Sequence, residues 1–175
     1  DAGFSTLIVG WRGYSGNQGI PTEKNLYLDG KATIEWILKN TKFNIEDIIN
    51  YGESLGSGVA VDLNLKYNFL CTVLEAPFTS IADVANKRYK IYPTKLLVKD
   101  KFDNLGKIDR IKSPLLIISG TNDEVVPHLH SKLLYNKANS PKKSLFIDEA
   151  MHNNLYDFGI EKTVINFSLK IWKLI

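Results

Sequence analysis

The chain has 175 residues, of which 44% are hydrophobic and 23% are charged, and its formal net charge is +3. These values are ordinary for a globular protein, and the length predicts one domain, residues 1–175. The small charge and the lack of a basic stripe among aromatic residues argue against a nucleic-acid partner. The single cysteine, Cys71, excludes an internal disulfide and favours a reducing compartment.

Apolar segments typical of strands alternate along the chain with segments of helical periodicity. The predicted strands are 5–10, 47–51, 70–75, 114–119 and 143–147, and the predicted helices are 22–40, 56–67, 127–138 and 155–174. Thr22 stands where the first helix would have its N-cap. Repeated strand–helix alternation predicts the fold class α/β, with a mostly parallel sheet flanked by helices.

The segment 52–56 reads G-E-S-L-G at the junction of a predicted strand and a predicted helix. This is the context of a nucleophile elbow, a strained turn that lifts one serine side chain out of the backbone. We expect glycine at positions 52 and 56 because a side chain there would collide with the neighbouring strand and helix. The pattern therefore predicts Ser54 as a nucleophile, and a plain tight turn is the alternative interpretation.

A serine nucleophile needs a base, and the chain has three histidines. His152 lies in the loop after strand 143–147, at the carboxyl end of a strand, where open α/β sheets place their chemistry. His128 and His130 open the helix 127–138, and two residues apart they point to different faces. We predict His152 as the base, with the other two as weaker candidates. Its plain alternative is a loop histidine that caps the last helix.

The acid that orients the base is predicted between the serine and the histidine in chain order. Asp123 follows the strand 114–119 in the loop G-T-N-D. Glu75, at the end of the preceding strand, is the rival acid, and Glu124 and Asp148 are weaker candidates. An Asx turn or a helix N-cap is the plain alternative for Asp123.

Five stretches in this order resemble the α/β-hydrolase superfamily, and specifically its Bem46-like serine hydrolases. They are residues 12–23, with R-G-Y and G-I-P-T-E, and residues 51–60, 75–80, 120–127 and 152–153. The sequence departs from the family pattern at Ser15 and Asn17, which carry no chemistry. The resemblance implies a serine hydrolase of carboxylic esters or thioesters, with Ser54 as nucleophile, Asp123 as acid and His152 as base.

The resemblance also implies about three strands and one helix ahead of residue 4, so the chain looks like the C-terminal two thirds of a hydrolase. One oxyanion donor would come from that region, which leaves the N–H of Leu55 as the donor here. Losing one such donor costs on the order of 10²–10³ in kcat. An inactive truncated hydrolase, or a non-catalytic binding module on the same fold, is therefore the alternative function.

The resemblance to the α/β-hydrolase superfamily also predicts a defect in the sheet. The implied absent strand would lie between 5–10 and the elbow strand, so we expect 5–10 to pair directly with the elbow strand. Displacement of 5–10 with unpaired backbone groups is the less favoured outcome. In either case we expect an exposed sheet edge that is open to self-association.

The segment 81–112 has no strand pattern and corresponds to the excursion where the superfamily inserts its cap. Six basic residues and one acid, Asp100, lie between Lys87 and Lys101, with apolar residues among them. A solvated surface is the simpler interpretation. The sharper hypothesis is contact with an anionic lipid headgroup or an acyl substrate.

Neither a metal nor an organic cofactor is expected, because no ligand spacing and no phosphate-binding glycine loop occur. The expected partner is a small-molecule or acyl substrate. No apolar run is long enough to span a membrane. We expect a cytoplasmic protein, associated with a membrane if an N-terminal anchor like that of related proteins exists.

Overall fold

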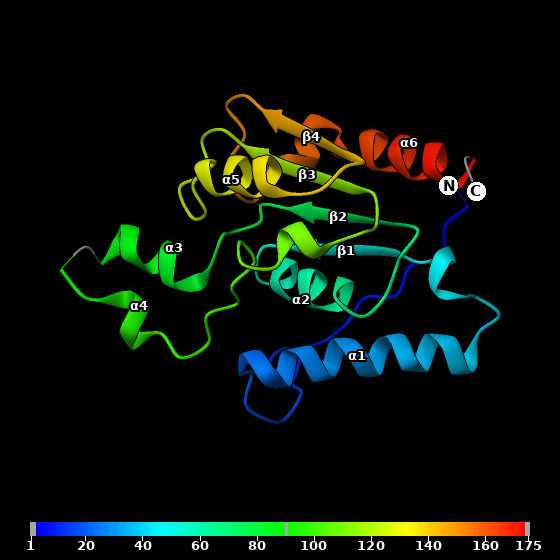
Figure 1. Cartoon of the computed structure of the whole chain (residues 1–175), viewed down its shortest axis with the longest axis horizontal. Helices are drawn as coiled ribbons and strands as arrows, with labels where there is room; N and C mark the ends of the chain where they lie inside the picture. The colour runs from blue at the N-terminus through cyan, green and yellow to red at the C-terminus, as the bar shows by residue number, and fades with distance from the viewer. Residues whose placement is uncertain (1–2, 90, 174–175) are drawn as a thin grey trace.

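The computed structural model describes residues 3–89 and 91–173, which form a four-stranded parallel sheet with helices on both faces (Figure 1). The strands lie in the order β1-β2-β3-β4 and all neighbours are parallel. Their bounds are β1 Ile49–Glu53, β2 Cys71–Glu75, β3 Leu115–Gly120 and β4 Lys142–Ile147. The predicted fold class is confirmed.

The helices occupy the connections between these strands and both flanks. The α-helices are α1 Glu23–Asn40, α2 Leu55–Asn64, α3 Ile81–Arg88, α4 Thr94–Leu97, α5 Leu129–Lys137 and α6 Ile160–Trp172. Short 3-10 helices are η1 Ile45–Asp47, η2 Ile108–Arg110 and η3 Leu155–Phe158. The Thr22 side chain caps α1 by accepting a hydrogen bond from the Asn25 N–H, as predicted. None of the described helices combines the length and apolarity needed to cross a bilayer.

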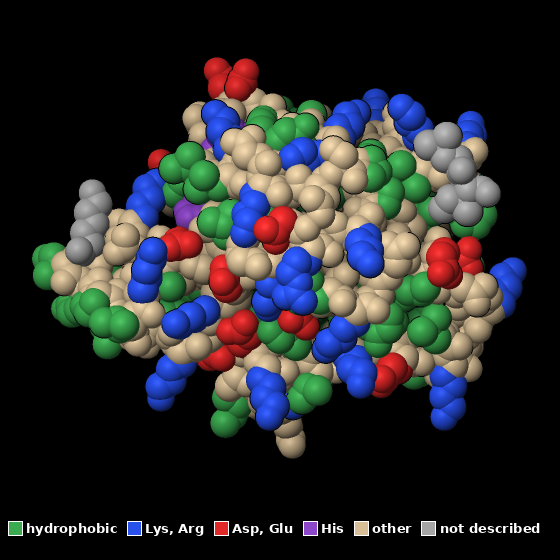
Figure 2. Space-filling model, viewed as in Figure 1, with side chains coloured by type: hydrophobic (Ala, Val, Ile, Leu, Met, Phe, Trp, Pro, Cys, Tyr) green, Lys and Arg blue, Asp and Glu red, His purple; other side chains and the backbone are tan. Residues whose placement is uncertain are grey.

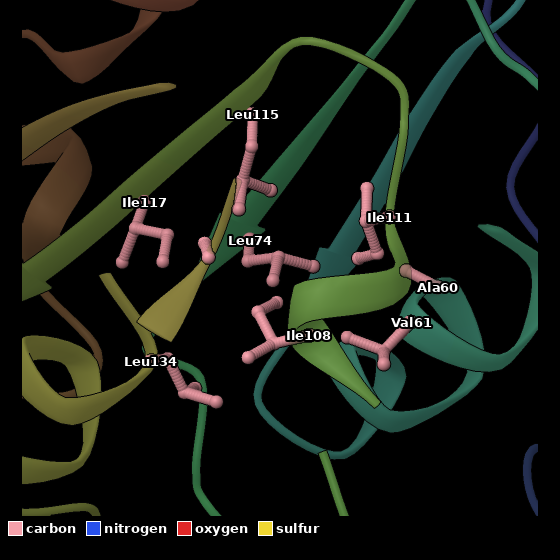
Figure 3. Packing of buried hydrophobic residues seen from close by; sticks show 9 residues of the cluster. Ala60, Val61, Leu74, Ile108, Ile111, Leu115, Ile117 and Leu134 are labelled. Carbon is pink, nitrogen blue, oxygen red and sulfur yellow. The ribbon is translucent and has the colours of Figure 1, made fainter. Parts of the chain in front are cut away.

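The alternation of side chains along β3 builds the two halves of the core. Leu115 and Ile117 point to the face covered by α2, η2 and α5, and Figure 3 shows them meeting Leu74, Ile108 and Leu134. Leu116 and Ile118 point to the opposite face, where α6 and the loop before it cover them. Burial on both faces explains why this strand is a continuous apolar run.

Helix α1 forms an outer layer against α2 (Figure 1). The two helices approach closely at Gly30, where a Cβ atom would lie 2.6 Å from Val59 Cγ1. Leu26 and Ile34 of α1 are buried on that side. The glycine therefore permits a close helix contact that any larger residue would push apart.

The predicted strand 5–10 is not a strand, and the expectation that it pairs with the elbow strand is wrong. Across the described residues, nothing pairs with the outer edge of β1, which ends the sheet. The segment from residue 3 to 10 runs irregularly, and Ile8 is 87% exposed. Its apolar, β-branched residues suit a strand, but a strand also requires a neighbour for its backbone groups.

The predicted helix 155–174 is divided in two. Leu155–Phe158 form η3, and α6 begins at Ile160. Gly159 lies between them with φ +71°, in the left-handed region that ends a helical turn. Leu155 and Ile160 are both buried on the α6 face of the sheet, so the break keeps apolar residues on one side.

Candidate functional site

Ser54 lies between the end of β1 and the first residue of α2, with φ 47° and ψ −116°. A non-glycine residue rarely takes this conformation, which costs on the order of 1–3 kcal/mol. A hydrogen bond of 2.9 Å from the Ser54 N–H to the carbonyl of Glu75 ties the turn to β2. The strained turn expected of a nucleophile elbow is therefore present at Ser54.

The two glycines of the elbow play different parts. A Cβ atom on Gly52 would lie 2.6 Å from the carbonyl oxygen of Gly56 and 2.7 Å from the Ala60 Cβ. A Cβ atom on Gly56 would meet nothing within 4 Å. The steric expectation therefore holds for Gly52 and is wrong for Gly56, because the start of α2 turns that position toward open space.

The structure brings Ser54, His152 and Asp123 together in one line of hydrogen bonds. His152 Nε2 lies 3.1 Å from Ser54 Oγ, and His152 Nδ1 lies 2.7 Å from Asp123 Oδ2. The Asp123 side chain is buried and that of His152 is nearly so. The hydrogen bond to Asp123 raises the pKa of His152, although burial of the ring opposes this.

The second oxygen of Asp123 shapes the loop after β3. Oδ1 accepts hydrogen bonds from the N–H groups of Val125 and Val126, at 2.9 and 2.8 Å. The Asx-turn alternative is therefore present as well, on the other oxygen of the same carboxylate. Both sets of bonds hold the carboxylate in one orientation toward His152.

Further hydrogen bonds hold the loop that carries His152 in place. The Asn122 N–H donates to the carbonyl of Ala150 at 3.0 Å, and the Met151 N–H donates to Asn154 Oδ1 at 2.7 Å. The backbone of Ala150 passes so close to Gly120 that a side chain at position 120 would collide with it. The base thus rests on backbone contacts as well as on its acid.

Glu75, the rival acid, is not a hydrogen-bond partner of His152, whose two ring nitrogens face Asp123 and Ser54. Its carboxylate accepts a hydrogen bond from the hydroxyl of Tyr51, and the Tyr51 hydroxyl lies 3.3 Å from that of Tyr156. Burial raises the pKa of Glu75, and the hydrogen bond from Tyr51 opposes that rise. Tyr51 begins the stretch 51–60 that carries the family resemblance, but no role is predicted for it, and Tyr156 lies outside the five stretches.

The weaker candidates lie elsewhere. His128 Nδ1 is 2.9 Å from Ser119 Oγ, and His130 Nδ1 is 2.8 Å from Thr79 Oγ1. Burial lowers the pKa of both rings. Glu124 and Asp148 are exposed side chains, and neither forms a hydrogen bond with His152.

The N–H of Leu55 is available to an oxyanion at Ser54. Leu55 is the first residue of α2, and the first amides of a helix have no acceptor within the helix. They also carry the positive end of the helix dipole, which favours a negative charge. An oxyanion on an acyl carbon bound to Ser54 Oγ would therefore meet a favourable field.

A hollow of about 610 Å³ borders the acid end of this line, and its lining residues are Lys87, Thr121, Asn122, Asp123, Glu124, Glu149 and Met151. Ser54 and His152 do not line it. Within residues 3–89 and 91–173, no group of three His, Cys, Asp or Glu side chains could hold a metal ion. The independence from cofactors stays an expectation.

Similar sequences include a human protein and a bacterial one. The chain is 38% identical over 151 residues to alpha/beta hydrolase domain-containing protein 17B of Homo sapiens, covering 85% of this chain and 50% of that protein. It is 35% identical over 152 residues to an uncharacterised protein of Mycobacterium tuberculosis, covering 87% and 54%. The chain thus spans about half the length of the curated relatives it matches. No protein-family model matches it.

Solved structures share the fold. An esterase of Pyrococcus furiosus aligns with a TM-score of 0.71 at 24% identity, covering 91% of this chain and 68% of that one. An alpha-beta serine hydrolase homologue from Coxiella burnetii aligns with a TM-score of 0.65 at 21% identity, covering 89% and 64%. At such identities the likeness is one of fold. The narrower resemblance to Bem46-like enzymes stays a prediction.

Proposed function

On the chain's similarity to α/β-hydrolases in sequence and fold, we propose that it is a serine hydrolase that cleaves a carboxylic ester or thioester through an acyl-Ser54 intermediate. The single observation that carries this proposal is the line of two hydrogen bonds from Ser54 through His152 to Asp123. The strained turn at Ser54 supports it, because such strain persists where it positions a reacting group.

In the first half of the reaction, Ser54 Oγ attacks the acyl carbon while His152 Nε2 takes the hydroxyl proton. The Nδ1–H of His152 donates to Asp123 Oδ2, which fixes the tautomer and stabilises the imidazolium. The tetrahedral intermediate places its negative oxygen near the Leu55 N–H. It then collapses, and the leaving alcohol or thiol takes the proton from Nε2.

In the second half, water replaces the leaving group. His152 Nε2 takes a proton from the water as its oxygen attacks the acyl carbon, and the proton returns to Ser54 Oγ as the acid leaves. The same geometry serves both halves, so no second base is needed. Substrate choice between esters and thioesters depends on the acyl pocket rather than on these three side chains.

The test is covalent labelling with a fluorophosphonate probe, which reacts with an activated serine. We expect wild-type protein to be labelled, Ser54→Ala to be unlabelled and Ser57→Ala to be labelled like the wild type. Ser57 is a matched control because it lies one turn into α2, and its buried Oγ has no hydrogen-bond partner. Labelling that survives in Ser54→Ala would refute the assignment.

Turnover is a separate measurement, made with short p-nitrophenyl esters and the matching thioesters. Labelling at Ser54 together with turnover supports the hydrolase. Labelling without turnover favours the alternative, an inactive hydrolase, since the probe requires an activated serine but no deacylation. Neither labelling nor turnover would favour a binding module on the same fold.

A further inference from the structure

The helices α3 and α4 form an excursion that extends beyond the layers of the fold (Figure 1). Its base is fixed to the body by hydrogen bonds. The Ile81 N–H donates to the carbonyl of Lys101 at 2.8 Å, and the Lys101 N–H donates to Glu23 Oε2 at 2.8 Å. The Glu23 N–H donates to Asp100 Oδ1 at 2.7 Å. The two ends of the excursion are therefore bonded to each other, and the end at residues 100–101 is bonded to α1.

The outer end of the excursion is apolar and faces solvent. We call it the projecting tip, defined by the exposed side chains of Tyr89, Ile91, Tyr92, Leu96 and Leu97. Ile91 is 94% exposed and Leu96 is 85% exposed. Folding buries little of these side chains, and least of Ile91 and Leu96, so the fold alone does not account for their apolar character.

The orientation of helix α4 directs its apolar side chains toward solvent. Thr94 is the buried residue of the helix, and its hydroxyl donates to the carbonyl of Ala82 at 3.0 Å. The polar side chain therefore faces the protein, while Leu96 and Leu97 face outward. An ordinary surface helix has the reverse arrangement.

Exposed basic side chains lie along the excursion, from the projecting tip back to its base. Those that the structure describes as exposed are Lys87, Lys95, Lys99 and Lys101. Figure 2 shows hydrophobic side chains at the outermost end of this excursion, with Lys and Arg side chains behind them. One acid, Asp83, pairs with Lys95 at 3.7 Å, an exposed contact. Lys90 and the side chain of Arg88 lie outside the described residues.

We propose that the projecting tip docks the protein on an anionic membrane surface. Apolar side chains at the outermost point would enter the interface, and the lysines behind them would lie at the level of the lipid headgroups. The excess of lysine over acid matches an anionic lipid rather than a neutral one.

This docking does not require hydrolysis, so it can be tested independently of the proposed function. If the hydrolase proposal holds, docking also brings acyl substrates to the site from the membrane. The link is α3 itself, since its Lys87 lines the hollow beside Asp123. Ser54→Ala should therefore bind vesicles as the wild type does.

The test is cosedimentation with vesicles of phosphatidylcholine alone and with about 30% phosphatidylserine. We expect binding to the anionic vesicles to be about tenfold stronger, and to weaken as salt is raised. A wild-type protein that does not sediment with the anionic vesicles would overturn the proposal.

The charge variant is Lys95→Glu with Lys99→Glu, and its matched control is Lys39→Glu with Lys42→Glu at the far end of α1. Both pairs take the formal net charge from +3 to −1. We expect the tip pair to weaken anionic binding about thirtyfold or more, since each lysine near such a surface contributes about fivefold. The control pair should have a much smaller effect. Equal losses would overturn the proposal.

The apolar variant is Ile91→Ser with Leu96→Ser, and its control is Leu28→Ser with Leu38→Ser on α1, which are also exposed. We expect about tenfold weaker binding for the tip pair alone. Thermal melting confirms that each variant is folded. Sedimentation velocity tests a second copy as the occupant: self-association that the tip pair abolishes, with vesicle binding unchanged, would overturn the membrane assignment.

Discussion

Replacing Asp123 with asparagine separates the two tasks of its carboxylate. Oδ1 holds the loop by accepting from the N–H groups of Val125 and Val126, and Oδ2 accepts from His152. An asparagine oxygen at the Oδ1 position preserves the loop. Its NH₂ group then faces His152 Nδ1 and donates to it, which moves the ring proton to Nε2. A protonated Nε2 cannot accept the proton of Ser54.

The expected loss in the rate of fluorophosphonate labelling is ~10⁴-fold, the scale measured when a catalytic triad is held in the wrong tautomer. This factor corresponds to about 5.5 kcal/mol of activation free energy. The free energy of unfolding should change by less than about 1 kcal/mol, because both loop hydrogen bonds remain. Urea unfolding measures the second quantity on the same samples.

The pH dependence gives an independent measurement. The hydrogen bond to Asp123 raises the pKa of His152, and burial of the ring lowers it. Since only neutral imidazole accepts a proton, the wild-type labelling rate should rise as pH increases through that raised pKa. In Asp123→Asn the raising effect is lost and burial remains, so the pKa of His152 should fall. NMR titration of the His152 ring from about pH 5 to pH 9 follows this shift.

Asp123→Ala is the control, because it removes both tasks. We expect the same loss of labelling and, in addition, a loss of stability, since an unpaired buried N–H costs about 1–3 kcal/mol. Labelling of Asp123→Asn at the wild-type rate would refute the reasoning. An equal loss of stability in the two variants would refute the division of labour between the two oxygens.

Two further predictions concern the elbow and its neighbours. Ser54→Gly should be more stable to urea than Ser54→Ala by about 1 kcal/mol, because glycine adopts φ 47° without strain; an alanine variant of equal or greater stability would contradict this. Tyr51→Phe should destabilise the protein by about 1–3 kcal/mol, because buried Glu75 loses its hydrogen-bond donor. Burial raises the pKa of Glu75, and the hydrogen bond from Tyr51 opposes that rise. Losing this hydrogen bond in Tyr51→Phe should therefore raise the pKa of Glu75 further. The stability of Tyr51→Phe is then retained at acid pH, where Glu75 is protonated, and is lost as pH rises through the raised pKa of Glu75. Urea unfolding at about pH 4.5 and pH 7.5 should show the larger loss at pH 7.5, and equal losses would contradict the reasoning.

The sequence correctly predicted residues as neighbours where local patterns placed each of them at the end of a strand. Ser54, Asp123 and His152 each follow a strand of a parallel sheet, and parallel strands end at one edge. The pair of Tyr51 and Glu75 could not be predicted in this way. It depends on the register of β1 against β2, which only the packed sheet determines.

The errors have the same physical origin. Residues 5–10 have a composition that suits a strand, but they do not pair with the free outer edge of β1, and composition alone does not determine which segments pair. At Gly56 the motif suggested a steric need, whereas the direction of α2 leaves that position open. Patterns in the sequence indicate which conformation a segment favours, whereas its contacts with the rest of the protein depend on the packed structure.

The position of Ser54 after an edge strand has a consequence for how long Ser54, His152 and Asp123 stay aligned. Among the described residues β2 is the only strand that pairs with β1, so opening that single ladder breaks the strand's backbone bonding to the sheet. Ser54 would then lose its alignment with His152 while the rest of the sheet stayed folded. Amide hydrogen exchange in β1 therefore measures how long the three groups stay aligned. Any chain that pairs with the outer edge of β1 would slow that exchange and hold the serine in place.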